Sequence, residues 1–318
     1  MAAGNGTVPL GHEVFQIDTR MAGYEGITAG YLIRGDRPCL VETGTAPSAP
    51  VVRDALAGLG IGPEDLATVV VTHIHLDHAG GAGDIAAMFP AARIVVHQRG
   101  ARHLADPSRL MASARMVYGD ALERLFGVLA PVPADRIVAL DDVGTVDLGG
   151  GRRLDSLYSP GHAKHHVGLV DSETGDLYVG DAAGVYLPDT GDVRPATPPP
   201  DFDLETALAS IRRFAARRPP RLLFSHYGPV GRVPEILDRS AEEIIVWVEE
   251  TRRARRQGLD LDHAVAMVLD RTKDRYAATS PDADPRLAEK LERVSSAAGN
   301  VEGILHWLEK TGASAEPG

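Results

Sequence analysis

The chain has 318 residues, of which 33 are Lys or Arg and 44 are Asp or Glu, so its formal net charge is -11 at pH 7. This acidic balance argues against a general nucleic-acid-binding role, while a hydrophobic content of 44 % is ordinary for a globular protein. The one cysteine, Cys39, excludes an intramolecular disulfide and lies in an apolar run that predicts its burial.

The first ten residues, 1–10, are small and polar, and we expect them to be disordered. They lack a basic region followed by an apolar core, so we predict no secretory signal. No apolar run in the sequence approaches the roughly 20 residues of a membrane span. We therefore expect a cytoplasmic protein that does not associate with a membrane.

Short strand-like runs follow, at residues 14–17, 29–33 and 39–41. The third run ends at Glu42, a carboxylate placed directly at a strand end. Residues 47–59 alternate at helical spacing and predict the first helix. These segments lead to the stretch that carries the chemistry.

That stretch follows the apolar run 66–71, which predicts a buried strand, and reads His73-Ile74-His75-Leu76-Asp77-His78. His73 and His75 are two residues apart, so an extended backbone places both on one face. Asp77 and His78 come at the turn and can point elsewhere, so one loop could serve two metal ions. A polar loop that is merely rich in histidine is the alternative, and four potential ligands within six residues disfavour it.

Beyond this loop the same alternation of strands and helices continues. Strands are predicted at residues 93–97, 136–140, 144–148 and 176–179, and residues 154–159 lead into a Pro-Gly-His corner. Helices are predicted at residues 110–129 and 204–217, the latter with Asp203 as N-cap. This pattern predicts an α/β or α+β fold. His97 and His103 have no partners in the motif, and we interpret both as packing or surface residues.

Residues 187–203 contain five prolines, so neither a helix nor a central strand is expected there. The stretch either lines the mouth of a site or simply connects two elements. From residue 234 the chain is helical in character, with helices expected at residues 236–257, 262–270, 285–298 and 301–310. We expect a helical extension over residues 234–312, without identifiable chemistry, and a frayed tail over residues 313–318. A cap or homodimer contact is one interpretation of the extension, and simple packing is the other.

The pattern His-x-His-x-Asp-His after an apolar strand resembles the signature of the metallo-β-lactamase-fold hydrolase superfamily, in its glyoxalase II and lactonase-like branch, with the subfamily unresolved. The resemblance implies three further ligands downstream, each at a strand end. Candidates in the right order are His162 in Ser-Pro-Gly-His, Asp181 in Tyr-Val-Gly-Asp and His226 in Phe-Ser-His. It also implies a four-layer αβ/βα sandwich, which we place at residues 11–233.

The resemblance further implies a dinuclear centre. His73, His75 and His162 would hold the first ion, Asp77, His78 and His226 the second, and Asp181 would bridge the two. These donors fit zinc, and also manganese or iron. Two ions about 3.5–4 Å apart can share a hydroxide and lower its pKa toward neutrality. Asp77 can also accept a proton from the attacking water.

Some positions depart from the family pattern. Relatives usually carry Asp in the place of Glu42, which we expect to orient a ligand. We interpret His166 as a second orienting group and His165 as facing solvent or the mouth. Lactonase-like relatives place a tyrosine where this chain has Gly184, so Tyr24, Tyr186 and Tyr227 become the candidates for contacting an oxyanion.

Three classes of function remain. The first is a dinuclear metal-dependent hydrolase that attacks a small ester, thioester, lactone or phosphodiester with a metal-bound hydroxide. The second is a mononuclear non-haem iron oxidoreductase of the persulfide dioxygenase type, which uses only the first ion site. The third is a non-catalytic binding protein, which the intact ligand set disfavours. We therefore expect a small-molecule substrate and no nucleic-acid partner.

Overall fold

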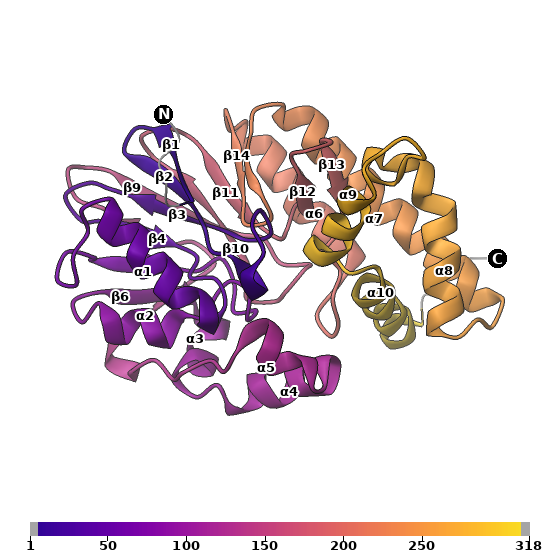
Figure 1. The fold of residues 1–318 in the computed structure, drawn as a ribbon, viewed down its shortest axis with the longest axis horizontal. Coiled ribbons are helices and arrows are strands. Elements are labelled where there is room, and N and C mark those ends of the chain that lie inside the picture. Colours follow the sequence, from indigo (N-terminus) through magenta and orange to yellow (C-terminus); the bar gives the residue numbers. More distant parts are fainter. Residues whose placement is uncertain (1–5, 313–318) are drawn as a thin grey trace. The chain divides into compact units, whose positions relative to one another are not determined.

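The computed structural model describes residues 6–312, which form two compact units (Figure 1). Of the described residues, unit 1 comprises 6–158 and 165–179, and unit 2 comprises 159–164 and 180–312. The predicted tail at 313–318 and the first five residues of the predicted disordered N-terminus lie outside the described residues.

A seven-stranded sheet forms the larger part of unit 1, in the order β1-β2-β3-β4-β5-β6-β7. Its strands are Thr7–Gly11, Val14–Asp18, Ala29–Ile33, Cys39–Val41, Thr68–Val70, Arg93–His97 and Ile137–Leu140. The pairs from β1 to β4 are antiparallel and those from β4 to β7 are parallel. Parallel neighbours need crossover connections, so helices must lie between these strands in sequence.

Those crossovers are α1 (Ala49–Gly58), α2 (Ala82–Met88), α3 (Gln98–Ala105), α4 (Ser108–Tyr118) and α5 (Ala121–Phe126). Figure 1 shows α1, α2 and α3 along this sheet. Their apolar faces pack with strand residues such as Leu40, Val69 and Ile94, each 0 % exposed, in one hydrophobic core. Near-continuous apolar strands of this kind are typical of a sheet that is covered on both faces.

The second sheet of unit 1 is an antiparallel meander of β8 (Thr145–Asp147), β9 (Arg153–Tyr158), β10 (Val167–Asp171) and β11 (Leu177–Gly180). Tyr31 of β3 meets Tyr178 of β11 edge to face, with ring centroids 5.3 Å apart. Both rings are 1 % exposed, so the two sheets pack face to face at this point. Unit 1 therefore contains helices and two packed sheets.

Unit 2 is mainly helical. It contains the two-stranded sheet of β12 (Val185–Leu187) and β13 (Asp192–Arg194), and the hairpin of β14 (Leu222–Phe224) and β15 (Gly228–Val230). Its helices are α6 (Leu204–Arg217), α7 (Val233–Arg256), α8 (Leu261–Thr272), α9 (Pro285–Val294) and α10 (Ala297–Thr311). Short 3-10 helices elsewhere in the chain span Met21–Gly23, Ala46–Ser48, Ala134–Arg136, Lys273–Arg275 and Ala277–Thr279.

Several predicted elements are confirmed. Helix α6 has the predicted bounds, and the Asp203 side chain caps it by accepting from the Thr206 N–H at 2.9 Å. Helices α7 to α10 occupy the predicted helical stretch; that residues 234–312 form a separate extension stays a prediction. Among the described residues, no helix combines the length and hydrophobicity that crossing a membrane would require.

Other expectations were wrong. Residues 7–10, expected to be disordered, belong to β1, because their backbone pairs with β2, Thr7 opposite Ile17, although most of their side chains are not buried. The single helix expected at residues 110–129 is two helices, α4 and α5. Gly119 separates them at φ 52° and ψ -133°, a conformation that only glycine adopts readily. By contrast, the proline-rich stretch 187–203 contains the short strand β13 of a two-stranded sheet, so it forms neither a helix nor a central strand, as expected.

Candidate metal centre

The ligand loop of unit 1 is a tight turn after β5. The His75 carbonyl accepts from the N–H groups of His78 and Ala79, at 3.1 and 2.9 Å, so the loop closes on itself. The His78 carbonyl in turn accepts from the Thr43 N–H at 2.8 Å. A Cβ at Gly80 would overlap the Leu76 carbonyl, so the glycine is required by the close approach of the backbone. The small residues after the motif therefore allow the loop to present its side chains.

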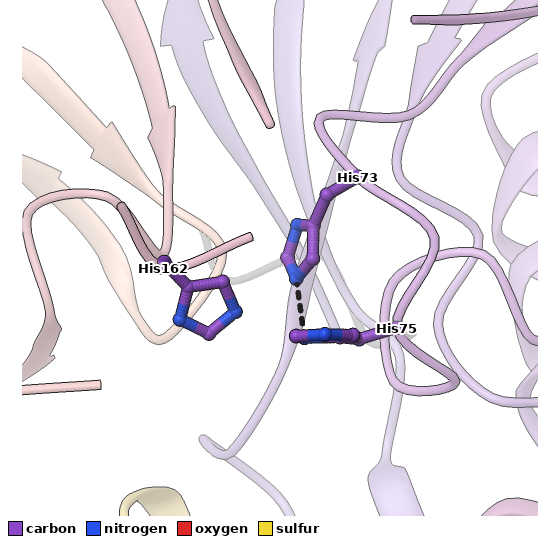
Figure 2. Close-up of side chains that lie close together, drawn as sticks. All are labelled: His73, His75 and His162. Carbon is purple, nitrogen blue, oxygen red and sulfur yellow. Dashed lines mark hydrogen bonds between the residues drawn. The ribbon is translucent and has the colours of Figure 1, made fainter. Parts of the chain in front are cut away.

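The histidines of this loop lie against one another. Nε2 of His73 is 3.1 Å from Nδ1 of His75, which Figure 2 marks with a dashed line. The rings of His73 and His78 are 4.0 Å apart between centroids, and both side chains are almost completely buried. Buried imidazoles need partners, because an unsatisfied polar group costs free energy away from water.

Glu42 supplies one such partner. It accepts from the Thr72 hydroxyl and lies with Oε1 3.4 Å from Nδ1 of His78. On the other side of that ring, Nε2 of His78 is 3.7 Å from Oδ1 of Asp77. Potential ligand atoms of Glu42, His73 and His78 all lie within 4.8 Å of one another. The expected role of Glu42 in orienting a ligand stays a prediction, and the short distance between its Oε1 and Nδ1 of His78 supports it.

Two more histidines, His165 and His166, lie next to this cluster. His166 is fully buried, and its ring centroid lies 5.0 Å from that of His73; its role as an orienting group stays a prediction. His165 is half-buried, and its Nδ1 accepts from the Ile74 N–H at 3.4 Å, so this ring supports the loop backbone. His97 is buried, contacts Asp142 at 3.0 Å and stacks on a tyrosine, which confirms the packing interpretation.

Unit 2 brings together the other three predicted ligands. Oδ2 of Asp181 is 3.6 Å from Nε2 of His162, and Oδ1 of the same carboxylate is 3.8 Å from Nε2 of His226. All three side chains are at least 94 % buried, with exposures of 6 %, 4 % and 3 % in that order. Each oxygen of the carboxylate thus faces a different imidazole.

These separations fit shared metal ions. Contacts of 3.6 and 3.8 Å are too long for hydrogen bonds. Two atoms that each lie about 2.1 Å from one tetrahedral ion are roughly 3.4 Å apart, which is close to both values. Imidazole nitrogens and carboxylate oxygens are donors for zinc, and also for manganese and iron. The donor set of each unit therefore fits a metal.

The corner that carries His162 is held by α6. The Pro160 carbonyl accepts from the Ser210 hydroxyl at 2.6 Å, and the Gly161 carbonyl accepts from the Asp203 N–H at 2.9 Å. Gly161 has φ +127°, and a Cβ there would overlap the backbone of Ala207. Pro-Gly-His is therefore the sequence that allows close contact between this corner and the helix.

Main-chain contacts complete the surroundings of the unit 2 ligands. Nδ1 of His162 donates to the Ala196 carbonyl at 2.9 Å. The Tyr186 N–H donates to the His226 carbonyl, and the Tyr227 N–H donates to the Tyr186 carbonyl at 3.2 Å. The contact with Ala196 could not be predicted from the sequence, because any residue type can supply a main-chain carbonyl.

The three candidate tyrosines differ in exposure. Tyr24 is 44 % exposed, whereas Tyr186 and Tyr227 are half-buried beside His226. Their expected contact with an oxyanion stays a prediction.

A family model described as the metallo-beta-lactamase superfamily matches residues 23–226. The chain is 29 % identical over 180 residues to the "Metallo-beta-lactamase fold-containing protein ST1585" of Sulfurisphaera tokodaii, covering 56 % of this chain and 66 % of that protein. In sequence it thus spans just under two thirds of this relative. The crystal structure of ST1585 is similar with a TM-score of 0.67 at 21 % identity, over 93 % of this chain and 99 % of that one, which shows the fold.

Two further relatives carry names of enzymes. The chain is 23 % identical over 245 residues to the "Probable metallo-hydrolase YqjP" of Bacillus subtilis, covering 70 % of this chain and 74 % of that protein. It is 30 % identical over 133 residues to a hydroxyacylglutathione hydrolase of Synechococcus, but this match covers 42 % of this chain and 40 % of that protein. The similarity to the second is therefore partial.

Proposed function

The chain belongs to the metallo-β-lactamase superfamily, and from this premise we propose that it is a dinuclear metal-dependent hydrolase. Its substrate is a small ester, thioester, lactone or phosphodiester. The observation that carries the proposal is the position of Asp181 between His162 and His226, with one carboxylate oxygen toward each ring. A carboxylate so placed can belong to two ions at once.

The loop of unit 1 would supply the remaining ligands of each ion. His73 and His75 would join His162 at the first ion, as the family resemblance implies. Asp77 and His78 join His226 at the second ion. In support, each proposed pair in unit 1 already has its donor atoms close together, at 3.1 Å for the first pair and 3.7 Å for the second.

Two bound divalent ions would acidify a water molecule and polarise the oxygen of the scissile bond. The residues of the chain supply orientation and proton transfer. Asp77 is half-buried, and its carboxylate can accept the proton of the attacking water. Cys39 is fully buried, and burial raises the pKa of its thiol far above the usual value, so it is not the nucleophile.

The first member of the substrate panel is a hydroxyacylglutathione, chosen because one relative is named a hydroxyacylglutathione hydrolase. A thioester, a lactone and bis-nitrophenyl phosphate complete the panel. The test is turnover of this panel by protein purified without added metal, and by the same protein reconstituted with zinc or manganese. The proposal expects turnover of at least one substrate that disappears with a chelator and returns with metal.

The donor set also fits iron, so the runner-up, an iron oxidoreductase that uses only the first ion site, must be measured on the same preparation. Oxygen uptake with a thiol persulfide, without turnover of any ester, thioester, lactone or phosphodiester, would replace the hydrolase with that alternative.

A further inference from the structure

Helix α10 holds a segment of unit 2 that carries no chemistry in the sequence. The Asn300 side chain is 4 % exposed and accepts from the Thr197 N–H at 2.7 Å. Its Nδ2 donates to the Pro195 carbonyl and to the Ser295 hydroxyl, both at 2.8 Å. The Thr197 hydroxyl also lies 3.2 Å from Oδ1 of Asn300, so the oxygen and the NH2 group of this buried amide are both satisfied, largely by one short segment.

Other contacts fix the same segment. The Thr197 hydroxyl donates to the Asn300 carbonyl at 3.1 Å, and the Ser295 hydroxyl donates to the Pro195 carbonyl at 2.9 Å. A Cβ at Gly303 would overlap the Thr197 carbonyl, so helix and segment meet backbone to backbone. These contacts fix Pro195 and Thr197, the two neighbours of a single residue that lies between them.

That residue is Ala196, whose carbonyl accepts from Nδ1 of His162 at 2.9 Å. A carbonyl oxygen only accepts, so Nδ1 of His162 carries the proton. In the neutral ring the lone pair then lies on Nε2, the atom that faces Asp181 at 3.6 Å. The position of one carbonyl oxygen therefore decides which nitrogen of His162 can bind a metal.

We propose that Asn300 is a positioning residue of the metal centre. Its amide holds Pro195 and Thr197, these hold the Ala196 carbonyl against His162, and the carbonyl fixes the tautomer and direction of the ring. The inference rests on the proposed function, since it takes His162 as a ligand. It also gives α10, at the far end of the chain, a part in the chemistry.

Asn300→Ala is the variant that tests this. A second variant, Asn300→Asp, keeps the acceptor for the Thr197 N–H but loses both donated bonds, and it serves if the alanine variant does not fold. The matched control is Thr272→Val. Thr272 is fully buried in α8 of the same unit, and its hydroxyl donates to the Val268 carbonyl at 2.8 Å, without a described bond to segment 195–197.

The first readout uses metal-free protein in which the histidines carry 15N, with His162→Gln to identify the resonances. We expect the wild type and Thr272→Val to hold His162 with the proton on Nδ1, and the Asn300 variants to show a mixture of tautomers. Folded Asn300 variants with an unchanged His162 spectrum would overturn the inference and leave Asn300 as a simple packing contact.

The second readout is metal affinity by competition with a chelator. Loss of a group that orients a metal-binding histidine costs about 10–100-fold in affinity. We expect that loss for one ion in the Asn300 variants and unchanged affinity in Thr272→Val. Equal weakening in the Thr272→Val control would show a general effect of stability and contradict the inference.

The two readouts separate this inference from the proposed function. If the wild type binds no metal, the proposed function fails, while the tautomer of His162 still decides the role of Asn300. If metal binds normally and the tautomer does not change in the variants, only the inference fails.

Discussion

The two units hold their proposed ligands in different ways. In unit 1 the ligands come from one turn, residues 73–78, which closes through its own backbone hydrogen bonds. In unit 2 they come from three separate segments, ending at His162, Asp181 and His226, and the segments of His162 and His226 are supported by elements distant in sequence. The turn also has single contacts with Thr43 and His165, whereas the unit 2 segments depend on α6, α10 and the β12–β13 hairpin. Distant substitutions should therefore affect unit 2 more.

The largest effect is expected from Asp181→Ala, which removes the carboxylate shared by both proposed ions. Activity should fall by more than about 100-fold, the upper range for groups that only orient a ligand. Metal content should fall for both ions, as measured by elemental analysis. Full metal content in the variant would show that Asp181 is not a bridge.

On the unit 1 side, Asp77→Asn should keep the fold and one metal ion. Hydrolysis should fall by about 10²–10⁴-fold, because the amide is similar in shape but cannot accept the proton. Turnover, metal content and oxygen uptake should be measured on the same preparation. Oxygen consumption with a persulfide that survives this substitution would favour the iron alternative.

Substitution of one glycine in each unit compares how much the ligand loop of unit 1 and the His162 corner of unit 2 depend on close backbone contacts. Gly80→Ala in unit 1 and Gly161→Ala in unit 2 each place a Cβ against neighbouring backbone, and each should lower the free energy of unfolding by about 1–3 kcal/mol. Gly231→Ala is the control, since a Cβ there meets nothing within 4 Å. Urea unfolding of the metal-free proteins measures the difference. A neutral Gly161→Ala would mean that the corner does not depend on α6 as described.

The smallest effect concerns the cap of α6. Burial raises the pKa of Asp203, but hydrogen bonds from Thr206 and Trp307 outweigh it and hold that pKa below its usual value. A depressed pKa contributes stability above the unfolded value of about 3.9, which is lost as the pH falls through the folded value. Asp203→Ala should cost about 1 kcal/mol at pH 7. The free energies of unfolding of the wild type and Asp203→Ala, measured at pH 7 and at about pH 3, should differ less at the lower pH. An equal difference at both pH values would contradict a role for the charged carboxylate.

The same contrast explains what the sequence could predict. The loop His73 to His78 was readable because its ligands are contiguous, and the Asp203 cap because capping is local. His162, Asp181 and His226 needed the resemblance to a family, since nothing local marks a residue at a strand end as a ligand. The assignment of ligands to ions stays a proposal.

Other features left no local signal. Strand β1 forms through backbone pairing with β2, so the pattern of its side chains does not predict a strand. The bonds of Asn300 to the main chain of Pro195 and Thr197 join residues more than 100 positions apart. Neither could be read from periodicity or composition, because both depend on how distant backbone segments meet.

The most direct test of the central claim is metal stoichiometry. Protein stripped with a chelator would be titrated with zinc, and separately with manganese, while bound metal and recovered turnover are measured together. We expect about two ions per chain, with turnover that requires the second. Saturation at one ion or fewer with either metal, with full turnover at that point, would contradict a dinuclear centre.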